Sequence, residues 1–253
     1  MWNFIKTFNP AYKWALIVFG ALAALIFLFS KPVMTQIQSY HLFIDSRNIF
    51  GIPNTFDVVS NIFFALTGFL GAKEVVKQED LITKKSWLWF FISIFLIAPG
   101  SAYYHWSPDD ATLVWDRLPM SMGFMALYIA LLTEHSQKSF EKYLPLALII
   151  GIASVVVWAI TGDLRFYFWV QFSSFITIPL ILILFSSHYT LKKYYVLTLV
   201  FYGLAKWAEA KDREIFAATS EIMSGHTLKH LLAAFALLSL WWMVRTRKRV
   251  AVA

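Results

Sequence analysis

The sequence SWLWFFISIFLIAPGSAYYHWSPDDATLVWDRLPMSMGFMALYIALLT, residues 86–133, decides the fold of this chain. Its two halves are long apolar runs of the kind that cross a membrane as helices, and only a short polar link around residues 107–111 separates them. Because the link is so short, the two helices must be antiparallel neighbours. Ser101, His105 and Asp116 then lie at the facing ends of the helices, where ionisable groups are rare unless they have a function.

The composition indicates a membrane protein. Of the 253 residues, 59% are hydrophobic and 15% are charged, whereas soluble domains contain about 25% charged residues. The absence of cysteine excludes disulfides and thiolate ligands, so histidine and carboxylate side chains are the expected metal ligands. The net charge of +7 does not indicate a nucleic-acid partner, because the Lys and Arg residues lie in short loops and tails between apolar runs.

The apolar runs predict an all-α fold, a polytopic bundle of eight transmembrane helices. The first run lacks a small-residue cleavage site after it, so we expect it to be a retained helix rather than a signal peptide. Pro99 and Pro179 are expected to bend their helices, and Pro119 to lie in the first turn of its helix. The expected helices are about 14–30, 57–76, 86–104, 112–133, 143–160, 166–186, 194–211 and 226–244.

The distribution of positive charge predicts the orientation of these helices. Eight crossings put both ends of the chain on one side, and most of the Lys and Arg residues between the runs fall on that same side. The positive-inside rule therefore predicts that both termini are cytoplasmic. His105, Asp116, His226 and His230 are then expected near the opposite, extracytoplasmic side. In a prokaryotic cell this chain would be a multi-pass protein of the plasma membrane.

Three histidines form the candidate metal site. His226 and His230 are four residues apart, so on a helix they share one face, with Cβ atoms about 5–6 Å apart. With His105 they can make an open zinc site whose fourth position holds water. Zinc would lower the pKa of that water toward about 7 and so supply the nucleophile. Asp116 can take a proton or orient a ligand, and Ser101 can bond the oxyanion of an attacked carbonyl.

Each of these residues also has a structural interpretation. A lone histidine in a membrane helix is often only an interhelical hydrogen-bonding group, Asp116 could cap its helix, and Ser101 could bond its own backbone beside a kink. A haem held by His105 and a second histidine is a further alternative. Two histidines four apart on one helix suit a single small ion better, and the shared depth of all five residues favours the metal site.

Other polar residues in the apolar runs have open roles at this stage. Asp57 either caps the second helix or contributes to a site, and Ser60 and Asn61 are expected to bond a neighbouring helix. Lys206, Glu209 and Asp212 either form a buried ion pair near the site or mark the edge of the membrane.

The motifs at the candidate site resemble those of the alkaline ceramidases. They are Gly100-Ser-x-x-x-His105, Asp116 followed by Leu-Pro-Met at 118–120, and His226-x-x-x-His230, together with Asn-Thr-Phe-Asp-Val-Val-Ser-Asn at 54–61. That family is part of a wider superfamily of seven-helix membrane hydrolases, which includes the adiponectin and progestin receptor family. The resemblance covers about residues 45–245.

The resemblance implies a fold, a site and an activity. Residues 45–245 would form a seven-helix hydrolase core, 1–44 an extra N-terminal helix and loop, and 246–253 a basic cytoplasmic tail. Zinc would be bound by the three histidines, His105, His226 and His230, with Ser101 and Asp116 beside it. The implied reaction is attack of zinc-bound water on the amide of ceramide or a related lipid amide, which enters from the bilayer and yields a sphingoid base and a fatty acid.

Two further points follow from the resemblance. Animal members carry a calcium-binding segment with a Trp-x-Glu-x-Asn run, which this sequence lacks; Asp45, Asn48, Asn54 and Asp57 are candidate substitutes, although loop and capping roles explain them equally well. The alternative function is a lipid-binding receptor or sensor of the same fold, in which the zinc is structural or only weakly catalytic.

Overall fold

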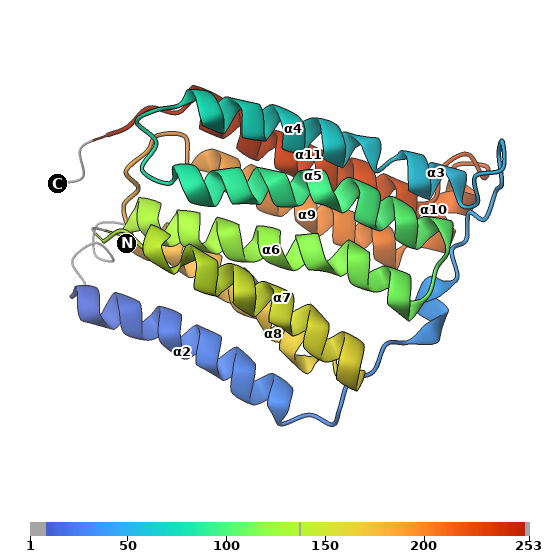
Figure 1. The fold of residues 1–253 in the computed structure, drawn as a ribbon, viewed down its shortest axis with the longest axis horizontal. Helices are drawn as coiled ribbons and strands as arrows, with labels where there is room; N and C mark the ends of the chain where they lie inside the picture. The colour runs from blue at the N-terminus through green and yellow to red at the C-terminus, as the bar shows by residue number, and fades with distance from the viewer. Residues whose placement is uncertain (1–8, 137, 251–253) are drawn as a thin grey trace.

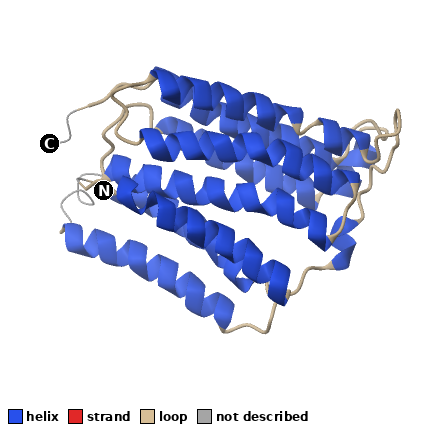
Figure 2. Ribbon diagram, viewed as in Figure 1, coloured by secondary structure: helices blue, strands red, loops and turns tan. Residues whose placement is uncertain are grey.

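A computed structural model of the protein describes residues 9–136 and 138–250. Within these ranges the chain forms one bundle of helices, and its only β-type pairs are two isolated bridges (Figure 1, Figure 2). The helices are α2 (Pro10–Phe29), α3 (Thr55–Val59), α4 (Ile62–Lys77), α5 (Lys84–Trp106), α6 (Asp110–His135), α7 (Leu144–Thr161), α8 (Arg165–Leu184), α9 (Lys193–Ala210), α10 (Asp212–Ala218) and α11 (Gly225–Thr246), with 3-10 turns η1 (Gln38–His41) and η2 (Glu141–Tyr143).

The long helices run side by side along the longest axis of the molecule (Figure 1). Six spans are long and apolar enough to cross a membrane by length and composition, which supports the predicted transmembrane bundle. These spans are Pro10–Phe29, Thr55–Lys77, Lys84–Trp106, Glu141–Thr161, Arg165–Leu184 and Gly225–Thr246. The charged helices α6 and α9 lie in the same bundle, and the count of eight crossings stays a prediction.

Helices α5 and α6 form the predicted antiparallel hairpin. Helix α6 begins with a capping box, in which the Asp109 carboxylate accepts from the backbone N–H of Thr112 and the Thr112 hydroxyl accepts from the backbone N–H of Asp109. The helix therefore starts earlier than expected, and Pro119 lies inside it rather than in its first turn.

The carbonyl of Trp115 receives no hydrogen bond from Pro119, because proline has no N–H. Gly100 of α5 packs against this carbonyl. A Cβ added at Gly100 would lie 2.2 Å from the Trp115 oxygen, so the close approach of the two helices requires glycine.

Two parts of the site end of the bundle depart from the expected helices. The second predicted helix is divided into α3 and α4 near Ser60, and the segment expected to be a plain link before the last helix contains α10. Gly225 lies at the first position of α11, where a Cβ would come within 2.2 Å of the carbonyl oxygen of Ala208 on α9. The close approach of α11 to the junction of α9 and α10 therefore requires glycine.

The opposite end of the bundle is held by a buried ion pair. Arg247, from the predicted basic tail, has a side chain 1% exposed and donates to both carboxylate oxygens of Glu134, which is 0% exposed. The same carboxylate accepts hydrogen bonds from Thr83, Trp87 and Tyr195. Residues 247–250 are also bonded to residues 188–190, so the described part of the tail is attached to the bundle.

Helix α2 packs along α8 at the edge of the bundle (Figure 1). The indole of Trp169 donates to the carbonyl of Ala21, and many apolar side chains of α2 are exposed, as expected for a surface that faces lipid. The segment 31–44 then crosses from α2 to the end of the bundle where α3 and α10 lie. This segment, which we call the strap, brings the part of the chain that precedes the expected core to the candidate site.

Candidate metal centre

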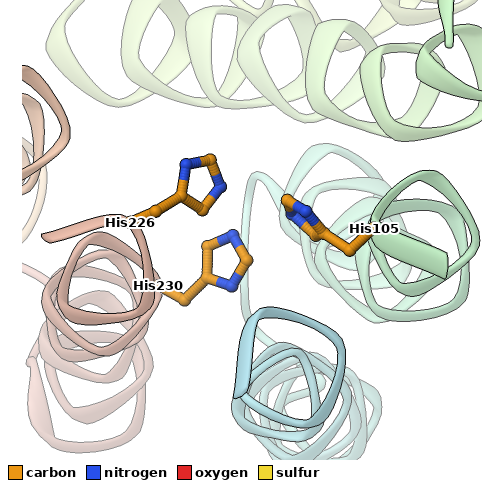
Figure 3. Close-up of side chains that lie close together, drawn as sticks. All are labelled: His105, His226 and His230. Atoms are coloured by element: carbon orange, nitrogen blue, oxygen red, sulfur yellow. The ribbon is translucent and has the colours of Figure 1, made fainter. Parts of the chain in front are cut away.

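The structure brings the three predicted histidines together. His105 lies in the last turn of α5, and His226 and His230 lie in the first turns of α11. Their possible ligand atoms are all within 4.8 Å of one another, and the three residues are 1%, 6% and 3% exposed. Figure 3 shows the imidazole rings facing one another from the two helices.

The orientation of His230 is set by Ser60. The Ser60 hydroxyl lies 2.7 Å from Nδ1 of His230 and 3.1 Å from the carbonyl oxygen of Asp57. Because the hydroxyl has one proton, which it donates to the carbonyl, it accepts from a protonated Nδ1. His230 Nε2 is then unprotonated and available as a ligand. The expected bond of Ser60 to a neighbouring helix is confirmed. The same expectation for Asn61 is wrong, because its amide donates to the backbone carbonyls of Asp57 and Val58 in its own segment.

His226 is positioned by the junction between α9 and α10. Its backbone N–H donates to the Asp212 carboxylate at 2.8 Å, which continues the close packing at Gly225. Burial raises the pKa of the Asp212 carboxyl above its ordinary value, and the hydrogen bond from His226 opposes this shift. In the side chain of His226, Nε2 lies 2.8 Å from the ammonium of Lys229.

His105 has the least satisfied ring of the three. Its Nδ1 is buried and has no hydrogen-bond partner, although the backbone carbonyl of the same residue accepts from the Asn54 amide at 2.8 Å. The ring of Phe43, from the strap, packs against His105 and His226 with centroid distances of 4.7 and 4.9 Å. An aromatic wall therefore limits the movement of two of the three imidazoles.

These residues fit a bound zinc ion. Three buried imidazoles, in a chain without cysteine, are a donor set that suits zinc. The buried Nδ1 of His105 has no hydrogen-bond partner in the protein, which is unusual for a buried polar atom unless a ligand binds it. Among the described residues, this is the one group of histidine, aspartate or glutamate that could hold a metal ion. The alternative of three unrelated hydrogen-bonding histidines is less consistent with this convergence.

Ser101 and Asp116 lie next to each other where α5 and α6 face. Ser101 is 3% exposed, and both residues line one cavity. Asp116 does not cap α6, because Asp109 has that role. The close packing of Gly100 against Trp115 holds the two segments together at this depth.

A cavity of about 630 Å³ connects these residues with the apolar interior. Its polar lining includes Ser101, Asp116, Lys229 and His230. Its apolar lining is formed by Phe90, Ile94, Leu127, Leu237 and Leu240, among others. Such a volume, with a few polar groups at one part of an apolar wall, is typical of a site for a small-molecule ligand.

The strap forms part of the wall of this cavity. The His41 ring bonds both Tyr104 and Asp110, and the backbone N–H of Leu164 donates to the carbonyl of Met34, so the strap is held at both ends. Burial, followed by the charge of Glu209, raises the pKa of the strap residue Tyr40 well above its ordinary value. The N-terminal segment therefore takes part in the site, which its sequence did not indicate.

The charged residues of α9 form an ion pair next to the histidines. Glu209 lies 2.8 Å from the ammonium of Lys206 and 3.0 Å from that of Lys229, so an ion pair forms. It is not the buried pair expected for Lys206, whose side chain is 56% exposed. Asp212 takes no part in it and instead bonds His226. Lys229 was missed, although its place between His226 and His230 is a signal that could have identified it.

Three of the four candidate calcium residues make contacts with other partners, and the fourth, Asn48, is exposed. Asp45 makes a bidentate pair with Arg47, Asn54 bonds the carbonyl of His105, and Asp57 accepts from the Thr227 hydroxyl at 2.6 Å. Asp57 therefore does not act as the side-chain cap of its helix. These contacts distribute the residues among different partners rather than around one cation.

Comparison with known proteins identifies a family relationship. A family model described as Ceramidase matches residues 46–246, which is most of the chain. Neither the search of curated proteins nor the search of solved structures found a match. The matched range contains His105, His226, His230, Ser101 and Asp116, whereas α2 and the strap lie outside it.

Proposed function

The chain belongs to the ceramidase family, and from this premise we propose that it is a zinc-dependent membrane enzyme that hydrolyses the amide of ceramide or a related lipid amide. Family membership implies an amidohydrolase that acts on a membrane lipid. The observation that carries the proposal is the buried histidine group beside a cavity that also exposes Ser101 and Asp116. The products would be a sphingoid base and a fatty acid.

The histidines would hold the metal. A bound zinc ion would supply a Lewis acid and make water a nucleophile near neutral pH. Nε2 of His226 cannot bind a metal and accept from Lys229 at once, so metal binding would leave the Lys229 ammonium to Glu209, which lies 3.0 Å away. Ser60 would keep His230 in the tautomer that leaves Nε2 free.

Asp116 and Ser101 would carry out the proton transfers and the positioning. The Asp116 carboxylate would accept a proton from the attacking water and return it to the amide nitrogen as the C–N bond breaks. The Ser101 hydroxyl, which lines the same cavity as Asp116, would donate to the carbonyl oxygen of the amide as negative charge develops there. Each residue would thus act on a different atom of the same amide.

The cavity would bind the acyl chain. Phe90, Leu127 and Leu240 lie on its apolar wall, so a hydrocarbon chain could be buried while the amide stays near the histidines. Burial of apolar lipid surface contributes about 25 cal/mol per Å², which favours long-chain over short-chain amides. The lipid would reach the cavity from the bilayer.

The proposal includes an arrangement in the membrane. We propose eight crossings, cytoplasmic termini and an extracytoplasmic histidine group, with residues 45–245 as the hydrolase core and residues 246–253 as a tail. Helix α2 begins, and α11 ends, at the end of the bundle away from the histidines (Figure 1), which supports a site on the side opposite the termini. Cysteine accessibility in a chain without native cysteines would test this topology directly.

Zinc content and fatty-acid release from ceramide, measured on wild type and His226→Ala, test the function. We expect bound zinc and release in the wild type, and loss of both in the variant. His188→Ala is the matched control, because His188 bonds the carbonyl of Ser136, away from the metal group. Equal release from wild type and His226→Ala would contradict the proposal.

A further inference from the structure

We propose that Tyr40 of the strap and Glu209 of α9 form a binding site for a hydroxyl group on the nitrogen side of the lipid amide. This inference rests on the proposed function and deepens it, because it names the part of the neutral substrate that the strap recognises. The site joins a segment that lies outside residues 46–246, the range matched by the family model, to a helix that lies within them.

The Tyr40 hydroxyl is accessible from the cavity and only weakly engaged by the protein. Tyr40 lines the cavity and is 38% exposed. Its hydroxyl lies 3.4 Å from Oε1 of Glu209, whereas hydrogen bonds between a hydroxyl and an oxygen acceptor are usually about 2.7–2.8 Å long. The phenol proton is therefore available to a closer acceptor in the cavity.

The Glu209 carboxylate has room for a further donor. Its side chain is 19% exposed and lines the same cavity, and it is bonded by Lys206 at 2.8 Å and Lys229 at 3.0 Å. An ionised carboxylate has about four acceptor positions, so two ammonium groups do not saturate it. A hydroxyl could accept from Tyr40 and donate to Glu209 at the same time, whereas a deprotonated oxyanion could not make the second bond.

Contacts within the strap hold Tyr40 in place. It lies in η1, and its ring stacks on that of Tyr104 with 6.4 Å between the centroids and 18° between the planes. The next residue, His41, is bonded to both Tyr104 and Asp110, and Gln38 at the start of η1 also bonds Asp110. Because the phenol is already positioned, little conformational entropy would be lost when it binds a ligand.

The proposed site lies close to where the amide would be cleaved. The Lys229 ammonium bridges the two groups, 3.0 Å from Oε1 of Glu209 and 2.8 Å from Nε2 of His226. In ceramide, the two carbons next to the one that carries the nitrogen each bear a hydroxyl. With the acyl chain in the apolar part of the cavity, one of these hydroxyls would reach Tyr40 and Glu209 while the amide carbonyl lies at the histidines.

Two ureas test the proposal without requiring turnover. N-dodecyl-N′-(2-hydroxyethyl)urea and N-dodecyl-N′-ethylurea differ by one hydroxyl, and their urea group resists hydrolysis. The affinity for each is measured on purified protein with added zinc in detergent, for wild type and Tyr40→Phe. We expect wild type to bind the hydroxyethyl urea about threefold to tenfold more tightly than the ethyl urea. Tyr40→Phe should lose most of this preference and keep its affinity for the ethyl urea.

Two further variants separate the hydroxyl site from general effects. Tyr103→Phe is the matched control, because Tyr103 is a tyrosine of α5 that is 52% exposed, and both affinities should stay unchanged. Glu209→Gln provides a second measurement on the acceptor side of the site. A neutral amide is a poorer acceptor than a carboxylate, so the preference for the hydroxyethyl urea should also fall in this variant.

The results distinguish this inference from the proposed function. Equal affinity of wild type for the two ureas would overturn the hydroxyl site, and so would a preference that persists in Tyr40→Phe or an equal weakening of both ureas in that variant. None of these results would affect the ceramidase proposal, which depends on zinc and release. Conversely, a Tyr40-dependent preference in a protein that releases no fatty acid would support the hydroxyl site and count against the enzyme.

Discussion

The two ends of the bundle both contain buried polar groups, but these groups are arranged differently. At the Glu134 end, one carboxylate is bound by Arg247 on both oxygens and by three further donors. At the histidine end, three buried imidazoles face one another, and Nδ1 of His105 has no partner. Both ends have further buried atoms without a partner, such as Oδ2 of Asp57 at the histidine end and Nε2 of His135 at the Glu134 end. The first cluster is therefore centred on a buried ion pair, whereas the second brings together atoms that could hold a metal ion.

The largest effect on activity is expected from Asp116→Asn. The amide keeps the shape of the side chain but cannot accept the proton of water, so the rate should fall by about 10²- to 10⁴-fold. Zinc content and lipid binding should remain, which separates catalysis from a receptor function. Asp80→Asn, an exposed change in a loop, is the control for the measurement of fatty-acid release. An unchanged rate would remove Asp116 from the mechanism.

The largest effect on stability is expected from Glu134→Ala. The change leaves the Arg247 charge buried without its partner and should cost about 3–5 kcal/mol in the free energy of unfolding. Thermal unfolding in detergent measures this loss. The zinc content of the protein that remains folded should be that of wild type, because the cluster lies at the other end of the bundle. Loss of zinc from folded protein would contradict the separation of the two ends.

A smaller effect is expected from Ser60→Ala. Without the hydroxyl, Nδ1 of His230 loses its partner, and zinc affinity should fall by about tenfold to hundredfold. Zinc titration of the metal-free variant measures the change. Ser239→Ala is a suitable control, because it removes another buried hydroxyl of α11 that bonds Thr198 and the carbonyl of Ala236 rather than a histidine. Equal zinc affinity in the two variants would show that Ser60 does not position His230.

Much of the helical organisation and the meeting of the histidines could be predicted from the sequence. The short link between α5 and α6 places His105 and Asp116 at one depth, and the four-residue spacing places His226 and His230 on one face. Both inferences depend only on residues close together in the sequence, that is, on the length of a link and the spacing along one helix. The family match over residues 46–246 confirms the resemblance that the same motifs indicated.

The parts that could not be predicted depend on tertiary contacts. Arg247 was assigned to a tail because its chain neighbours are basic, and only the folded bundle shows that Glu134 meets it. Gln36 belongs to a segment with no motif, yet it bonds Arg117 across 81 positions of sequence.

The most direct test of the central claim is zinc reconstitution. Metal-free protein would be titrated with zinc while fatty-acid release from ceramide is followed, with His105→Ala as the variant that should not respond. We expect release to rise with added zinc and to level off at one zinc per chain. Release that is unchanged by removing and restoring zinc would contradict the assignment of the three histidines as the catalytic metal site.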